Sequence, residues 1–339
     1  MNVEEKALLT SVLRDVSRSF YLTLRVLPSS VRRPIGIAYL LARATDTIAD
    51  TEIVKLPIRL DALQRLRARI EGVSNARLDF GGFAQQQGTP GERILLQRID
   101  DVLRVFQSLT VSDQLHVKSV LRTIISGQEL DLERFSQASA KNIIPLQSDA
   151  DLTDYTFRVA GCVGEFWTKL CLAHFPLNSI LNRPQLIDNG IRFGKGLQLV
   201  NILRDIPADL KNGRCYIPEA ALGSAHLTPT DLTAPGNIEK FRPVYDRYLN
   251  YAEQHLEAGW IYTNTLPFNW CRIRLACAWP ILIGLRTIAH LRRENPLDPS
   301  RRVKASRREV KSLILRSIIS YPFPRAWRAQ YTRALIHLR

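Results

Sequence analysis

The sequence predicts an all-α fold, and two observations support this. Almost every periodic segment carries apolar residues at three- and four-residue spacing, which places them on one face of a helix. Alternating apolar and polar runs bounded by turn residues, which are typical of strands, are absent. The 339 residues are 45% hydrophobic and 23% charged, enough apolar material for a large core, and they show no internal repeat. We therefore expect a single helical domain.

The predicted helices follow one another with short breaks. In chain order they cover residues 7–27, 31–49, 60–70, 93–109, 113–135, 151–175, 184–210, 238–266, 272–293, 306–319 and 326–338. Two longer loops interrupt them, a Gly/Gln-rich segment at 73–90 and a Pro/Thr/Gly-rich segment at 211–235. Neither has the composition of an inter-domain linker. The second follows an acidic motif directly, so it is a candidate for a lid over a site.

Cysteine usage and the N-terminal residues favour a cytoplasmic protein. The five cysteines show no CxxC or zinc-type spacing, so we expect free thiols in a reducing compartment. The first ten residues contain two acids and no apolar core of a signal peptide. The longest uncharged apolar run, 275–285, is too short to span a bilayer. We expect a protein that is cytoplasmic, either in solution or peripheral at the inner face of the membrane.

Positive charge is concentrated at the C-terminus. The net charge is +15, and residues 286–339 hold 14 Lys and Arg against 3 Asp and Glu, a difference of +11. Three kinds of partner would suit this segment: nucleic acid, an anionic membrane surface or a phosphorylated small molecule. A solvated basic face with no partner is the remaining alternative.

Two pairs of aspartates stand four residues apart, Asp46 with Asp50 and Asp205 with Asp209. Residues at this spacing share a helix face, so the carboxylates repel each other unless a cation lies between them. Oxygen ligands without His or Cys favour a hard ion such as Mg²⁺. One such pair is common on exposed helix surfaces, but both pairs lie in apolar runs and both follow an arginine, Arg43 or Arg204. We expect the two helices to face each other, hold a magnesium cluster and bind a diphosphate, with the arginines on the remaining phosphate oxygens.

Four longer stretches surround these residues. They are SRSFYLTLRVLP (17–28), AYLLARATDTIADT (38–51), YTFRVAGCVGEFW (155–167) and GLQLVNILRDIPADLKNGRCYIP (196–218). In sequence and order they resemble the squalene/phytoene synthase family, the head-to-head prenyl synthases. The resemblance covers most of the chain up to about residue 293. It implies a single-domain isoprenoid (terpenoid) synthase helical bundle around a central cavity.

The resemblance also implies roles for individual residues. Metal binding falls to Asp46, Asp50, Asp205 and Asp209, and proton transfer to Tyr155. Binding of the prenyl diphosphate substrate falls to Arg18, Ser19, Phe20, Tyr39, Arg43, Gln198, Asn201 and Arg204. Gly161 and Gly164 would allow close approach of a ligand or, equally, of a neighbouring helix. The chain departs from many relatives at Ala49 and Ala208, where an acid is common, so the metal site is less negative here.

The branch of the family depends on a nicotinamide site. The family joins two prenyl diphosphates through a cyclopropyl intermediate, and only formation of squalene then needs NADPH. The stretch SRRVKASRREV (300–310) is similar to a basic flap of squalene synthases, and RIRLACAWP (272–280) looks like the squalene branch. Cofactor binding then falls to Arg18, Arg43, Arg204, Lys304 and Arg307. A basic linker before a helix is the alternative for the flap.

These observations together predict an enzyme that converts farnesyl diphosphate to squalene through presqualene diphosphate, using Mg²⁺ and NADPH. A synthase of dehydrosqualene, hydroxysqualene or phytoene that works without reduction is the main alternative. A non-enzymatic nucleic-acid-binding protein would explain the basic C-terminus but leaves the paired aspartates without a role, so we expect no nucleic acid partner. We expect a monomer, with a catalytic domain at 1–293 and, within the same domain, the flap and C-terminal helices at 294–339.

The last predicted helix has a mixed apolar and basic character. One stripe holds Trp327, Tyr331, Ala334, Leu335 and Leu338, and the arginines at 325, 328 and 333 lie mostly off it. Such a helix suits an interface with an anionic membrane. It equally suits a helix that packs its stripe on the domain and leaves its arginines in solvent.

Overall fold

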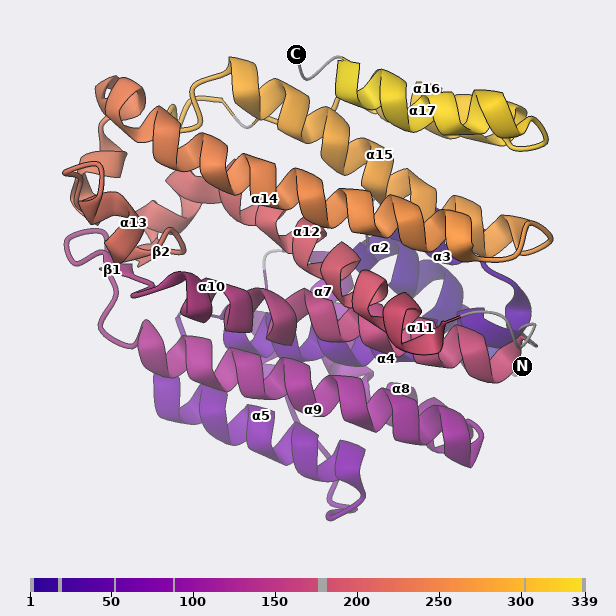
Figure 1. Ribbon diagram of the computed structural model, residues 1–339. Helices are drawn as coiled ribbons and strands as arrows, with labels where there is room; N and C mark the ends of the chain where they lie inside the picture. The colour runs from indigo at the N-terminus through magenta and orange to yellow at the C-terminus, as the bar shows by residue number, and fades with distance from the viewer. Residues whose placement is uncertain are drawn as a thin grey trace. The chain divides into compact units, whose positions relative to one another are not determined.

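The computed structural model describes residues 3–17, 20–51, 53–87, 89–175, 182–301 and 303–336. Helices make up most of this part of the chain, so the all-α prediction is confirmed (Figure 1). The chain divides into two compact units. Unit 1 comprises Met1–Ser136 and Phe166–Leu177, and unit 2 comprises Gln137–Glu165 and Asn178–Arg339.

Unit 1 is built around helix α4. Its elements are α1 (Val3–Ala7), the π-helical turn η1 (Leu8–Val12), α2 (Leu13–Ser17), α3 (Phe20–Val26), α4 (Ser29–Ala49), α5 (Leu56–Glu71), α6 (Gly81–Gln85), α7 (Pro90–Gln97), α8 (Ile99–Gln107) and α9 (Val111–Arg134). Helix α4 contacts α5, α8 and α9 and buries Leu40, Leu41, Ala44 and Ile48 completely. Because this side of α4 is buried in the core, only the opposite side of the helix can contact a ligand.

Local signals explain where the helices of unit 1 begin and end. Thr89 and Thr110 accept hydrogen bonds from backbone N–H groups in the first turns of α7 and α9. Pro90 occupies the first position of α7, where its missing N–H has no cost. Gly72 ends α5 with a φ of 81°, a conformation that suits glycine. The predicted helix at 93–109 is divided in the structure, because α7 ends at Gln97 and α8 starts at Ile99.

Unit 2 is built around helix α12. Its elements are β1 (Ile144–Pro145), α10 (Asp149–Thr156), the π-helical turn η2 (Phe157–Gly161), α11 (Cys162–His174, shared with unit 1), α12 (Arg183–Lys211), β2 (Arg214–Cys215), α13 (Glu219–Gly223), the 3-10 turns η3 (Pro229–Thr233) and η4 (Pro235–Asn237), α14 (Ile238–Thr265), α15 (Cys271–Arg293), α16 (Arg307–Ser320) and α17 (Pro324–Ile336).

Helix α12 packs along much of its length on α14. The buried Tyr245 of α14 donates a hydrogen bond from its hydroxyl to the Leu203 carbonyl of α12, at 3.0 Å. The two strands pair in parallel, Ile144 with Arg214 and Pro145 with Cys215, and are the only regular strands in the described residues. Strand β2 lies inside the segment 211–235 that the sequence predicts as a loop, and β1 lies between the predicted helices 113–135 and 151–175.

Glycines allow η2 and α11 to approach α12 closely. A Cβ at Gly164 would lie 1.8 Å from the Gly190 carbonyl oxygen, and one at Gly194 would lie 2.2 Å from the Ala160 carbonyl oxygen. Only glycine fits at such backbone contacts. Packing against a neighbouring helix therefore accounts for Gly164. The predicted helix at 151–175 is continuous in path but consists of α10, η2 and α11, with a π-helical turn in the middle.

None of the helices within the described residues combines the length and hydropathy needed to cross a bilayer.

Candidate active site

The predicted site residues of α4 form one polar stripe. Tyr39, Arg43, Asp46 and Asp50 are separated by four, three and four residues, which places them on the same face of the helix. The apolar residues of α4 occupy the opposite face. The sequence therefore folds locally into a helix whose core contacts orient four functional side chains together.

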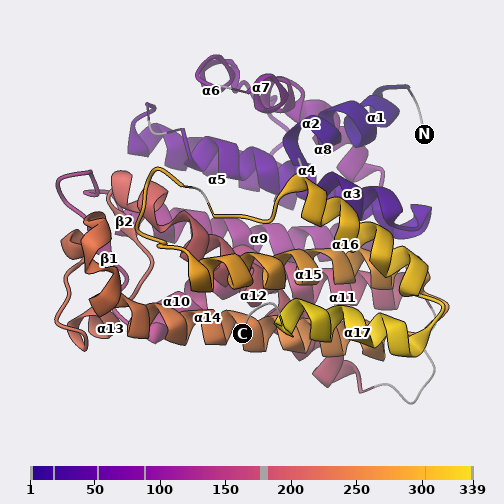
Figure 2. The same ribbon diagram turned by 90° about the horizontal axis from the view of Figure 1, so that it is seen from above.

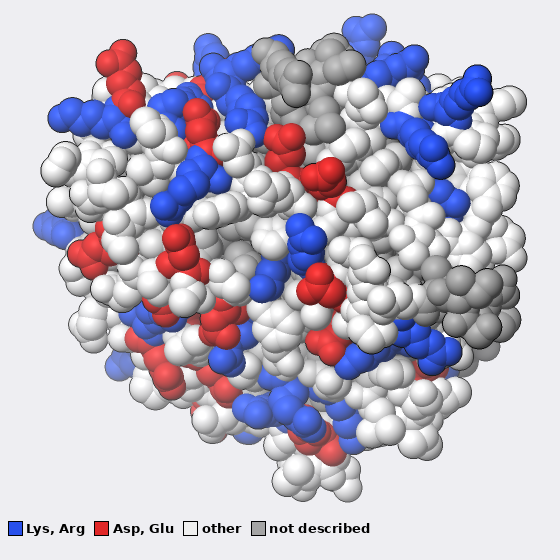
Figure 3. Space-filling model, viewed as in Figure 1, with Lys and Arg blue, Asp and Glu red and all other residues white. Residues whose placement is uncertain are grey.

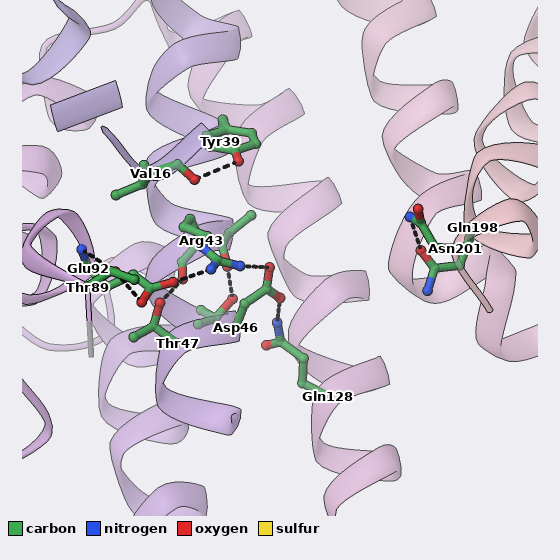
Figure 4. Close-up of polar contacts among 12 residues, drawn as sticks. Val16, Tyr39, Arg43, Asp46, Thr47, Thr89, Glu92, Gln128, Gln198 and Asn201 are labelled. Carbon is green, nitrogen blue, oxygen red and sulfur yellow. Dashed lines mark hydrogen bonds and ion pairs between the residues drawn. The ribbon is translucent and has the colours of Figure 1, made fainter. Parts of the chain in front are cut away.

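Asp46 is the centre of the polar contacts in unit 1 (Figure 4). The Gln128 side-chain amide on α9 donates to Asp46 Oδ1 at 2.5 Å, and Arg43 Nη1 lies 3.9 Å from Asp46 Oδ2. Burial and the Asp50 carboxylate raise the pKa of Asp46 to about 7, although Arg43 and Gln128 act in the opposite direction. The Asp46 side chain is nevertheless 44% exposed, so its oxygens can accept a further ligand. Without a cation this pair of carboxylates is electrostatically unfavourable.

Arg43 is oriented by an acid from another helix. Glu92 of α7 accepts a short hydrogen bond from Arg43 Nη2, and the Thr89 hydroxyl donates to the other Glu92 oxygen. Although burial opposes it, the carboxylates of Asp46 and Glu92 raise the pKa of Arg43, which therefore keeps its charge. Arg43 Nε is buried and has no hydrogen-bond partner among the described residues. Arg43 thus has a fixed position and an unused donor.

Two further predicted residues meet beside α4. The rings of Phe20 and Tyr39 are stacked, with centroids 5.3 Å apart. The Tyr39 hydroxyl donates to the Val16 carbonyl at 3.4 Å. The predictions for Arg18 and Ser19 fall on residues outside the described part of the chain.

The predicted site residues of α12 form a second polar stripe in unit 2. Gln198, Asn201, Asp205 and Asp209 are separated by three, four and four residues and therefore share one face. The Asn201 side-chain amide donates to Gln198 Oε1 at 3.4 Å (Figure 4). Helix α12 continues through Pro207 and ends at Lys211, so Asp209 still belongs to its last turn.

Arg204 and Asp205 form a two-point ion pair. Arg204 Nε donates to Asp205 Oδ1 at 3.0 Å and Arg204 Nη2 donates to Asp205 Oδ2 at 2.5 Å. This geometry fixes the plane of the guanidinium. Arg204 thus pairs directly with a predicted metal ligand, whereas Arg43 pairs mainly with Glu92.

Tyr155 lies near the end of α12. Its ring stacks on that of Tyr216, with centroids 4.6 Å apart. Tyr216 lines a small cavity together with Asp209 and Cys215, among other residues. The π-helical turn η2 begins two residues after Tyr155, and such turns are frequent at functional sites. Unit 2 therefore joins Tyr155, through Tyr216, to the second aspartate pair.

Sequence reasoning missed three residues of this arrangement: Gln128, Glu92 and Tyr216. Gln128 is a polar residue on the buried side of a predicted amphipathic helix, which is a usable signal. Tyr216 lies within a motif that carries the family resemblance, and this position is the signal that could have identified it. Glu92 looks like an ordinary acid in the first turn of a helix, and nothing in the sequence links it to Arg43.

The donor atoms fit magnesium. Each pair offers carboxylate oxygens, and Gln128 Oε1 beside Asp46 is buried without a partner in the described part of the chain. No group of three or more His, Cys, Asp or Glu that could hold a metal is found within the described ranges. Mg²⁺ needs only one or two protein carboxylates when water and substrate phosphate complete its octahedron. The residues therefore suit an ion that is bound together with its substrate.

The predicted flap residues fit a phosphate group. Lys304 lines a pocket of about 310 Å³ with His290, Glu294, Arg301 and Val303. Lys304 and Arg307 are both exposed, and Arg307 is the first residue of α16. Cationic side chains at a helix N-terminus are suitable for an anionic ligand.

The last helix packs its stripe on unit 2. Trp327, Tyr331 and Ala334 are buried, and the rings of Trp327 and Tyr331 stack on Trp260 at 5.2 and 5.3 Å. The alternative in which this stripe packs on the domain is confirmed, and its assignment to a membrane interface is wrong. The Leu335 side chain and Leu338 lie outside the described residues.

Comparison with known proteins identifies the family of this chain. Residues 13–309 match the squalene/phytoene synthase family. The chain belongs to that family. The resemblance stated from four motifs is thereby confirmed.

The relatives include both branches of the family. The chain is 30% identical over 213 residues to a bifunctional lycopene cyclase/phytoene synthase of Blakeslea trispora, an alignment that covers 61% of this chain and 32% of the relative. It is 26% identical over 314 residues to the squalene synthase of Schizosaccharomyces pombe, covering 91% of this chain and 64% of the relative. The chain spans less than half the length of the bifunctional relatives that it matches.

A solved complex of TcSQS shares the fold. It superimposes with a TM-score of 0.81 at 19% identity, over 99% of this chain and 91% of that chain. The fold of this synthase family member is therefore the isoprenoid synthase helical fold, as predicted.

Proposed function

We propose that the chain is a squalene synthase, which condenses two farnesyl diphosphates head to head and reduces the intermediate with NADPH. The two aspartate pairs on polar helix stripes carry the first half of this proposal, since they suit Mg²⁺ with a diphosphate. The observation that carries the second half is the basic segment 300–310, where Lys304 opens onto a pocket beside α15. The curated relatives include phytoene synthases and squalene synthases and so do not choose between the products.

Ionisation of the first farnesyl diphosphate requires its diphosphate to leave with the bonding electrons. Asp46, Asp50, Asp205 and Asp209 would hold Mg²⁺, which neutralises charge on the departing group when bound. Arg43, held by Glu92, and Arg204, held by Asp205, bind phosphate oxygens and stabilise the charge that develops as the carbon–oxygen bond breaks. Their acids keep both guanidiniums in place before substrate arrives, so no reorganisation is needed during the step.

Tyr155 is the proton-transfer group of this proposal. The double bond of the second farnesyl chain attacks the allylic cation, and loss of a proton closes the cyclopropane ring of presqualene diphosphate. The Tyr155 hydroxyl accepts this proton or relays it to the released diphosphate. Stacking on Tyr216 fixes the plane of the ring and limits its motion. Phe20 and Tyr39 present aromatic surface to the prenyl chain and help exclude water from the cations.

The flap completes the second half-reaction. NADPH would supply the hydride that ends the rearrangement of the ring. Lys304 and Arg307 would bind its phosphates. Residues 294–339 belong to the same domain as the helices that precede them, which is supported by their inclusion, with residues 178–293, in unit 2. We also propose that the enzyme acts as a monomer in the cytoplasm.

Product analysis tests the proposal. The purified chain is incubated with farnesyl diphosphate and Mg²⁺, with and without NADPH, and the hydrocarbons are identified by gas chromatography and mass spectrometry. Squalene in the presence of NADPH, and presqualene diphosphate or non-reduced products in its absence, would support it. Dehydrosqualene or hydroxysqualene at the same rate with and without NADPH would overturn the squalene assignment. So would phytoene from a parallel incubation with the longer geranylgeranyl diphosphate. In that case the family and the magnesium chemistry would stand.

A further inference from the structure

The outward face of α16 is apolar. Leu315, Ile318 and Ile319 are between 47% and 62% exposed, and Phe323, in the turn before α17, is 62% exposed. The residues at 311, 315, 318 and 319 share one side of the helix, and all of them face solvent. We refer to Leu315, Ile318, Ile319 and Phe323 as the α16 outer face.

The inner face of the same helix is only partly apolar. Ser317 and Ser320 are buried, and the indole N–H of Trp279 on α15 donates to the Ser317 hydroxyl at 2.9 Å. A surface helix normally buries its aliphatic residues and exposes its polar ones. Helix α16 half-buries Val310, Leu313 and Ile314 on this side, so its core contacts are already made without the aliphatic residues of the outer face.

The chain segment that carries the outer face has one sign of charge. Residues 310–336 contain Lys311, Arg316, Arg325, Arg328 and Arg333 and no Asp or Glu. All five basic residues are exposed. The nearest acid in the sequence, Glu309, accepts hydrogen bonds from Arg286 and the Ser306 N–H and is therefore already neutralised. In Figure 3, Lys and Arg without Asp or Glu appear in the region where Figure 1 places α16 and α17.

Phe268 extends this surface from the α14–α15 turn. It is exposed, and its ring stacks on Tyr321 with centroids 4.9 Å apart. The Tyr321 hydroxyl in turn donates to the Phe268 carbonyl at 2.5 Å. Because Tyr321 directly follows α16, Phe268 is fixed near the C-terminal end of the outer face. Helices α16 and α17 lie beside α15 in both views (Figures 1 and 2), so the surface is part of a packed structure.

We propose that the α16 outer face, with Phe268 and the surrounding basic residues, docks unit 2 on an anionic lipid bilayer surface. Aliphatic and aromatic side chains beside Lys and Arg are the combination that inserts shallowly at the headgroup level. A second copy of the chain is a poor occupant, because it would bring two surfaces of the same positive charge together. The inference does not depend on which prenyl product the enzyme forms.

Co-sedimentation with vesicles tests the proposal on the full chain. The vesicles contain phosphatidylcholine alone or phosphatidylcholine with phosphatidylglycerol. The variant Leu315→Gln/Ile318→Gln/Ile319→Gln should bind the anionic vesicles about tenfold or more weakly than the wild type, because three aliphatic side chains no longer leave water. Glutamine keeps helix propensity. The matched control Ile58→Gln/Val111→Gln/Leu115→Gln, at positions between 50% and 76% exposed, should bind like the wild type.

A charge series separates a local surface from the net charge of the molecule. Lys311→Gln/Arg316→Gln/Arg325→Gln should bind anionic vesicles about tenfold more weakly and lose most of the dependence on NaCl. Arg14→Gln/Arg77→Gln/Arg104→Gln removes the same net charge at exposed positions of unit 1 and should change binding little. Equal weakening by the two charge variants would show that binding follows net charge, and the proposal would fail.

Two further outcomes also decide the matter. Wild-type binding by the aliphatic variant would overturn the proposal. So would sedimentation velocity that shows a concentration-dependent dimer of the wild type and a monomer of this variant, since the outer face would then be a self-association surface. Circular dichroism checks folding, and if the triple variant is unfolded, the single substitution Leu315→Gln at an exposed position provides the same comparison.

Discussion

At the scale of the residue, Asp46 and Asp205 each have a defined set of charged and polar neighbours. Each carboxylate has one fixed cationic neighbour, and Asp46 also accepts from Gln128. Electrostatic repulsion remains, because a second carboxylate lies one turn away on the same helix face. A divalent ion bound as proposed above would remove this repulsion, so metal binding would be linked to local stability.

Neutralising one carboxylate of each pair should abolish turnover and leave the fold intact. Asp50→Asn and Asp205→Asn should each lower kcat by about a hundredfold or more, since losses of 10- to 100-fold already follow from changes around metal ligands. In the absence of Mg²⁺, Asp50→Asn should melt at the same or a higher temperature than the wild type, because the repulsion with Asp46 is gone. Turnover is assayed with farnesyl diphosphate and melting by calorimetry.

A surface aspartate serves as the control for these variants. Asp61→Asn, at an exposed ion pair with Arg65 on α5, should change neither activity nor melting. Near-wild-type turnover by Asp50→Asn or Asp205→Asn would remove that residue from the metal site.

Tyr155→Phe isolates the role of one hydroxyl. The phenylalanine ring still stacks on Tyr216, so the free energy of unfolding should change by less than about 1 kcal/mol. Formation of presqualene diphosphate should fall by about 10²- to 10⁴-fold, as expected when a proton-transfer group is lost. Tyr216→Phe is the control and should keep most activity. Normal formation of the intermediate by Tyr155→Phe would leave this tyrosine with a role in the tunnel wall only.

At the scale of the element, helix starts and helix crossings decide how the site is supported. Helix α16 begins with a capping box, in which Ser306 and Glu309 bond each other's backbone N–H groups. Glu309 also accepts from Arg286 Nε at 2.6 Å and lies 3.1 Å from His290 Nε2, both on α15. One carboxylate therefore starts α16 and attaches it to α15.

The attachment of α16 should depend on pH through Glu309. Burial acts to raise the pKa of Glu309, but hydrogen bonds from Ser306 and Arg286 lower it to about 2 from an ordinary value of 4.5. Because the folded-state pKa is the lower one, the stabilisation is complete above pH 4.5 and is lost as the pH falls toward 2. Glu309→Gln should destabilise the protein by about 1–3 kcal/mol at pH 7, and its difference from the wild type should shrink between these two pH values.

Thermal melting across this pH range measures the effect. Glu294→Gln provides the comparison, because the exposed pair of Glu294 with Arg301 at 3.4 Å contributes less than about 1 kcal/mol. A difference between Glu309→Gln and the wild type that is independent of pH would show that hydrogen bonding to the neutral group suffices.

The crossing of α11 and α12 should tolerate no side chain at Gly164. A Cβ there would overlap the Gly190 carbonyl oxygen at 1.8 Å, and neither backbone can retreat without disturbing its helix. Gly164→Ala should destabilise by about 3 kcal/mol or more, measured by denaturant unfolding. Gly223→Ala, where no atom lies within 4 Å of the added Cβ, should change stability little. A stable Gly164→Ala protein would mean that the crossing can open.

At the scale of the whole molecule, most of the net positive charge lies in a different part of the sequence from the two aspartate pairs. The C-terminal residues from 286 carry +11 of the net +15. Within unit 2, this charge appears in two places with different surroundings: at Lys304 beside a pocket, and around the aliphatic outer face of α16. Our two proposals therefore assign one basic segment two separate roles, in binding a phosphorylated cofactor and in docking on lipid.

The flap should affect only the second half-reaction. Lys304→Ala/Arg307→Ala should form presqualene diphosphate at the wild-type rate and accumulate it, or non-reduced products, at limiting NADPH, with a KM for NADPH raised about tenfold. Lys141→Ala/Lys240→Ala removes two other exposed lysines of unit 2 and should behave as the wild type. Equal damage to both half-reactions would assign the flap a general structural role or one in diphosphate binding.

The sequence by itself determined the helices and the two polar stripes of this protein. Both depend on spacing along one chain segment, and the 3.6-residue period of a helix converts spacing into a shared face without any knowledge of neighbours. The stripes of α4 and α12 therefore appear in the structure as predicted. The family followed from motifs that are also local in sequence.

Tertiary structure alone decided which side chains complete the stripes and which apolar faces are covered. Gln128 reaches Asp46 across 82 residues of chain, and Glu92 reaches Arg43 across 49, so no local pattern joins them. The aromatic stripe of α17 and the aliphatic face of α16 look alike in sequence, yet Trp260 covers the first and solvent meets the second. The physical reason is that periodicity shows that a face is apolar, whereas only packing with distant residues determines what lies against it.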